Sequence, residues 1–92
     1  MIVKISLPDK EGLLDGHKVI SDVEEYTYYA VRIKPHKLNE PMILSENKMP
    51  QNEDEEMSVT LLVLYTKQGK KVIYCNVPVY FMEDGRTVDR IN

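Results

Sequence analysis

The sequence predicts an all-β fold, or a β-rich fold with minor helix: a small antiparallel barrel or sandwich of about five to seven short strands. Two apolar runs, at residues 58–66 and 71–81, carry this prediction, because Val, Leu, Ile, Thr and Tyr dominate both. The polar turn between them contains Gly69, which supplies the positive φ that a reversing backbone needs. Alternation of apolar and polar residues predicts further strands elsewhere.

The N-terminal part is predicted to hold two strands separated by a polar loop. Residues 1–7 alternate and stop at Pro8, which is typical of a half-buried strand. The loop spans residues 9–16 and closes on the hairpin dipeptide Asp15-Gly16. A short strand over residues 17–21 follows.

Residues 25–34 are predicted to form a strand with one core face and one outer face. We expect the core face to carry Thr27, Tyr29, Val31 and Ile33. The outer face then carries Tyr26, Tyr28, Ala30, Arg32 and Lys34.

Residues 35–57 are the least regular stretch and contain Pro35, Pro41 and Pro50. Connections of this length are uncommon in compact domains, so either residues 42–45 form an edge strand or the stretch serves a function. Its acidic second half, at about residues 45–57, is predicted to be an irregular, mobile loop within a single domain that spans residues 1–92.

The first arm of the central hairpin is apolar on both faces, which predicts a central strand. Pro78 cannot donate to a strand ladder, so the second arm is predicted to be two strand segments with a bend between them. Asp84-Gly85 is a second turn signal, and residues 86–91 are predicted to return as a short terminal strand.

Composition narrows the class of protein. The net charge of −3, from 12 basic and 15 acidic residues, argues against a strongly basic DNA-binding protein. No apolar run approaches the roughly 20 residues of a membrane span, so we expect no membrane partner. The single cysteine and the lack of a signal peptide predict a cytoplasmic protein without an intramolecular disulfide.

Catalytic chemistry is not indicated. Cys75 shares a hairpin face with Ile73 and Val77, which predicts a core residue rather than a nucleophile. His17 and His36 are predicted to be solvated, and neither has zinc-ligand spacing. We therefore expect no enzyme activity, no metal and no cofactor.

Two sets of residues are candidates for binding. The first is the acidic, methionine-bearing loop, which suits another protein as partner: Met49, Glu53, Asp54, Glu55, Glu56 and Met57. The second is an alternative, in which aromatic and basic side chains of a small barrel hold single-stranded nucleic acid: Tyr26, Tyr28, Arg32 and Lys34. A further alternative is a structural or assembly subunit that oligomerises through its β edges, for instance as a homodimer.

A compact β domain with one acidic loop and no catalytic group resembles small phage-encoded proteins that bind and inhibit a host or defence protein. The resemblance rests on size and composition and transfers no residues. It implies an inhibitor or regulator that occupies a partner's surface. Our leading hypothesis is accordingly a non-enzymatic protein-binding module.

Overall fold

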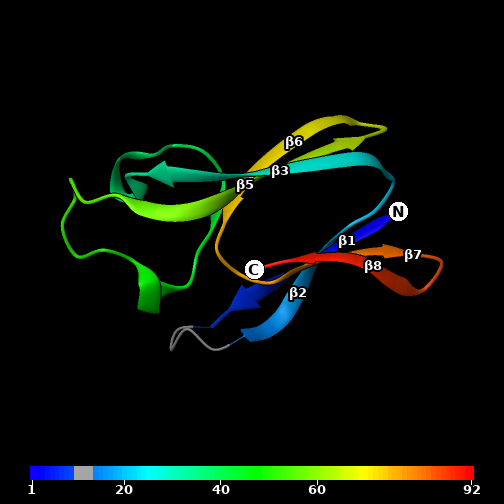
Figure 1. Cartoon of the computed structure of the whole chain (residues 1–92), viewed down its shortest axis with the longest axis horizontal. Coiled ribbons are helices and arrows are strands. Elements are labelled where there is room, and N and C mark those ends of the chain that lie inside the picture. The colour runs from blue at the N-terminus through cyan, green and yellow to red at the C-terminus, as the bar shows by residue number, and fades with distance from the viewer. Residues whose placement is uncertain (10–13) are drawn as a thin grey trace.

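The computed structural model describes residues 1–9 and 14–92, which form a two-layered, sandwich-like all-β structure (Figure 1). The predicted fold class is confirmed, and the sandwich is the alternative that the chain adopts. The described residues hold eight strands in two sheets of four, a count above the predicted five to seven, and two short 3₁₀ turns at Pro35–Lys37 and Glu46–Lys48.

The two ends of the chain build the first sheet and its middle builds the second. The first sheet has the order β2-β1-β7-β8, with bounds Leu14–Ile20, Ile2–Pro8, Val79–Glu83 and Arg86–Ile91. The second has the order β3-β5-β6-β4, with bounds Val23–Ile33, Met57–Thr66, Gly69–Cys75 and Met42–Ile43. Neighbouring strands are antiparallel except β4 and β6, which are parallel.

One apolar layer lies between the sheets and forms the core. Strands β1 and β7 contribute Val3, Ile5 and Phe81, which are fully buried. From the second sheet, Leu62 and Leu64 of β5 complete the layer and are equally buried. Because β5 lies between β3 and β6, its prediction as a central strand is confirmed.

The predicted faces of β3 are reversed at Tyr26 and Tyr29. Tyr26 faces the interior, where its ring stacks on Phe81 at a centroid distance of 3.9 Å. Tyr29 instead lies on the outer face, 53% exposed. Thr27 and Val31 share the strand face of Tyr29 and are half-buried. Ile33, on the same face at the end of β3, is 9% exposed, so its predicted burial is confirmed. Both faces of β3 carry apolar or aromatic residues, so alternation alone could not identify the inner one.

The predicted turn at Asp15-Gly16 is wrong, because both residues lie within β2. Ser6 pairs with His17 and Pro8 with Leu14, so β2 carries an extra residue opposite this part of β1. Gly16 has a φ of 113°, which is the backbone conformation that a bulge requires and that glycine adopts without strain. Residues 10–13 of the polar loop predicted at residues 9–16 lie outside the described residues.

Pro78 marks the point where the chain crosses between sheets, as its lack of an N–H predicted. Strand β6 ends at Cys75 in the second sheet, and β7 begins at Val79 in the first. The Pro78 carbonyl accepts a hydrogen bond from the Ser6 N–H at 3.0 Å, and Val77 is buried. The predicted edge strand at residues 42–45 is also present, shortened to β4.

Adjacent leucines on β5 test which face is the interior. We expect Leu62→Ala to lower the free energy of unfolding by about 2–5 kcal/mol, because it opens a cavity in the core. Leu61→Ala, on the half-buried outer face, should cost about 1 kcal/mol or less. Urea denaturation followed by circular dichroism measures both. Equal losses would contradict the assignment of the two faces.

Candidate protein-binding surface

The outer face of the second sheet is apolar, although it faces away from the core. Strand pairing places seven apolar or aromatic side chains side by side there, and we call them the outer apolar face: Tyr29, Val31, Leu61, Val63, Tyr65, Val72 and Tyr74. The outer face of an antiparallel sandwich is ordinarily polar, with alternation along each strand. Here the outward positions of β5 from Met57 to Tyr65 are apolar throughout.

This face offers large side chains to solvent. Tyr29 and Tyr65 are 53% and 42% exposed, and Leu61, Val72 and Tyr74 are half-buried. Val63, in the row between them, is buried at 8% exposure. A shallow hollow of about 520 Å³ lies beside the two exposed tyrosines. Tyrosine combines a large apolar ring with a hydroxyl and is enriched where proteins bind one another.

Charged residues border the outer apolar face on both sides. Glu24 and Glu25 line the hollow at the β3 edge. Lys70 lies opposite, because both Glu25 and Lys70 pair with Tyr65. An apolar centre with a charged rim is the arrangement that protein interfaces use.

The acidic segment leads directly into this face. Met57, the first residue of β5, pairs with Ile33. Glu56 accepts a hydrogen bond from Arg32 Nε at 3.2 Å, and Asp54 forms an ion pair with Lys37. Two of the four acids thus bind basic side chains of the same chain, and the mobility expected for residues 45–57 stays a prediction.

The other predicted members of this segment lie in different settings. Glu53 and Glu55 are exposed and form no ion pair with any residue that the structure describes. Met49 is half-buried and follows the turn Glu46–Lys48. The Met49 N–H donates a hydrogen bond to the Glu46 carbonyl. The structure therefore places Met57 at the outer apolar face, while Met49 belongs to the connecting segment.

Tyr26 and Tyr28 join the two sheets at one side of the sandwich. Both hydroxyls donate to Asp89 Oδ2 of β8, at 2.9 Å and 3.2 Å. Hydrogen bonding from Tyr26 is the main cause that lowers the pKa of Asp89, and the Arg90 N–H and Tyr28 lower it further against partial burial. We call these three side chains and Phe81 beneath them the tyrosine–aspartate clasp.

The arrangement of these residues gives little support to the alternative that the protein binds single-stranded nucleic acid. Stacking on bases requires open ring faces, and the Tyr26 ring is stacked on Phe81 in the interior while its hydroxyl is bonded to Asp89. Arg32 binds Glu56 and Ser58, while Lys34 is exposed at the far end of β3. The four residues thus do not form one continuous aromatic and basic surface.

The reactive side chains are held apart. Cys75 is fully buried, and burial raises its pKa to about 11. Its side-chain partner is the amide of Asn92, with Nδ2 3.8 Å from Sγ. His17 and His36 are exposed, and His36 Nε2 lies 2.7 Å from the Pro50 carbonyl oxygen. The prediction of Cys75 as a core residue is confirmed.

No known protein family, curated protein or solved structure matches this chain. Among the described residues, no helix is long and apolar enough to cross a membrane.

Sequence reasoning did not identify the outer apolar face as a surface. The signal was present, because the alternate residues Leu61, Val63 and Tyr65 face the same way on β5. Their apolar character was interpreted as burial on both sides of a central strand, which is true of Val63 at 8% exposure but not of Tyr65 at 42%. Whether a second layer covers the outer side depends on tertiary structure, which alternation does not encode.

The tyrosine–aspartate clasp should make the folding stability of the protein depend on pH in the acidic range. The Asp89 pKa is lower in the folded than in the unfolded chain, where it is about 3.9. Stabilisation is therefore complete above that value and is lost as the pH falls through the folded pKa, since the unfolded chain takes up the proton first. We expect Asp89→Asn to reduce the loss of melting temperature between about pH 5 and pH 2. If the melting temperature of Asp89→Asn fell with pH in parallel with that of the parent, the role of Asp89 in the clasp would be contradicted. The exposed residue change Glu55→Gln is the control.

Proposed function

We propose that this protein is a non-enzymatic binding module whose partner is another protein, and that it docks through the outer apolar face. One observation carries the proposal: Tyr29 and Tyr65 are exposed on the outer apolar face, beside the half-buried side chains of Leu61, Val72 and Tyr74. Covering such a face removes apolar area from water, which is the main favourable term in protein association.

The acidic segment has a second role in this proposal. Glu53 and Glu55 precede β5, at the opposite end of the β3–β5 pair from Glu24 and Glu25, so both ends of this pair carry exposed acids. Exposed charges of one sign accelerate encounter with an oppositely charged surface. The partner is accordingly a protein whose apolar patch is bordered by basic side chains. By occupying that patch the module acts as an inhibitor or regulator in the cytoplasm.

Paired surface substitutions test the docking face. We expect Tyr29→Ser with Tyr65→Ser to weaken partner binding at least about tenfold, because exposed tyrosines at interfaces contribute strongly. The partner is captured from the native cell on the parent protein after nuclease treatment, identified by mass spectrometry, and its affinity for each variant is measured by calorimetry.

The matched control changes two equally exposed apolar residues of the first sheet. Val19→Ser with Val88→Ser, whose parent side chains are 53% and 56% exposed, should bind like the parent. Equal affinity of the tyrosine variant and the parent would refute the docking face. Loss of every captured protein on nuclease treatment would favour nucleic acid, and light scattering detects a second copy as the partner.

The acidic segment should affect the rate of association. We expect Glu53→Ser with Glu55→Ser to lower the association rate constant about two- to fivefold at low salt and to leave dissociation nearly unchanged. Surface plasmon resonance at two salt concentrations with the captured partner measures both constants, and Asp15→Ser on β2 is the control. A change confined to dissociation would mean that the acids lie in the contact itself.

A further inference from the structure

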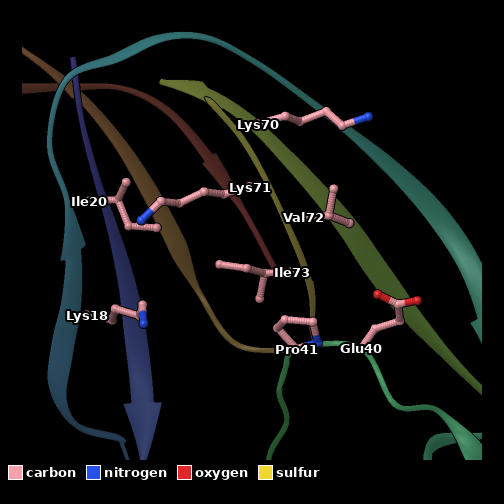
Figure 2. A pocket seen from close by; sticks show the side chains of 8 residues that line it. All are labelled: Lys18, Ile20, Glu40, Pro41, Lys70, Lys71, Val72 and Ile73. Carbon is pink, nitrogen blue, oxygen red and sulfur yellow. The ribbon is translucent and has the colours of Figure 1, made fainter. Parts of the chain in front are cut away.

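The two lateral sides of the sandwich, where the edges of the two sheets face each other, differ in structure. On one side the tyrosine–aspartate clasp bridges β3 and β8. On the opposite side, a groove of about 440 Å³ lies between β2 and β6 (Figure 2). Lys18 and Ile20 enter it from β2, Lys71 and Ile73 from β6.

The backbone edge of β6 lies exposed along this groove. Strand β4 pairs with β6 only at Tyr74 and Cys75. The Tyr74 N–H donates to the Pro41 carbonyl at 3.0 Å, on the β4 side. Backbone groups alternate in direction along a strand, so the N–H and C=O groups of Val72 and Lys70 point to that same side. In the described part of the chain, no strand pairs with them there.

The lining of the groove defines the chemistry of an occupant. Three of the eight lining residues are lysines, Lys18, Lys70 and Lys71, and Glu40 is the one carboxylate among them. Ile20 and Ile73 are buried at 5% and 6% exposure and form an apolar floor. The groove therefore combines an unpaired strand edge, an apolar floor and an excess of positive charge.

We propose that the groove binds an extended acidic segment of another protein by strand addition to the free edge of β6. The added strand pairs with the backbone of Lys70 and Val72 and occupies the edge beyond the start of β4. Its apolar side chains contact Ile20 and Ile73, and its carboxylates lie near the lysines. The groove meets the outer apolar face at Val72, but the exposed tyrosines of that face, Tyr29 and Tyr65, do not line the groove, so different residues test the two proposals.

A short acetylated peptide of alternating glutamate and valine is the probe. In ¹⁵N-labelled parent protein we expect saturable NMR shifts at the amides of Lys70, Val72 and Ile20 at about 50 mM salt. The matched peptide of alternating lysine and valine should bind at least about tenfold more weakly, since like charges oppose it. Equal binding of the two peptides, or no shift at about 1 mM acidic peptide, would overturn the proposal.

Two variants separate the backbone contact from the charges. Val72→Pro removes the outward N–H, and proline is tolerated on an edge strand whose N–H faces solvent. It should abolish binding while thermal unfolding stays cooperative.

Lys18→Glu with Lys71→Glu should weaken binding at least about fivefold, whereas Lys67→Glu in the hairpin turn should not. If Val72→Pro does not fold, the lysine variants decide: parent-like binding by the double variant refutes strand addition in this groove. Tyr29→Ser with Tyr65→Ser should leave peptide binding unchanged.

Discussion

The structure depends on one apolar layer in which β5 packs across β1 and β7. Leu62 and Leu64 lie on one side of this layer, and Val3, Ile5 and Phe81 lie on the other, all fully buried. A domain of this size buries only about 60–65% of the surface of its unfolded chain, so a single layer supplies most of the driving force. The strand order of both sheets places the richest apolar strands over this layer.

The two sides of the sandwich and the outer face of its second sheet differ in structure. The tyrosine–aspartate clasp closes the β3–β8 side through hydrogen bonds between side chains. The β2–β6 side remains a groove with lysines at its mouth. The outer apolar face includes β5 as well, because the residues of β5 from Leu61 to Tyr65 are all apolar or aromatic and alternate between its two sides. Packing accounts for the inner side of β5 and for Val59 and Val63, which are buried on its outer side, and binding is our proposal for exposed Tyr65.

Alternation and turn signals predicted most of the fold. The positions of β1, β3, β5 and β8, the break at Pro78 and the edge strand β4 all followed from local patterns. The interior face of β3 did not, because Tyr26 and Tyr29 are equally suited to a core, and only the stack on Phe81 distinguishes them. Gly16 was assigned to a turn because a bulge and a turn require the same backbone conformation. Within the candidate site, the acidic segment and Met57 could be predicted from the sequence. The groove and the outer apolar face could be recognised only once the strand order was known.

The pairing of β1 with β7 has a consequence for how the domain behaves as a whole. Four residue pairs, from Ile2–Met82 to Ile5–Val79, join strands from opposite ends of the chain. The first sheet cannot be complete until both ends are in place, and the second sheet has no other layer to cover Leu62 and Leu64. We therefore expect neither half of the sequence to be stable on its own. Contacts so distant in sequence favour slow, all-or-none folding, in which the sandwich gains its stability only when the chain is closed.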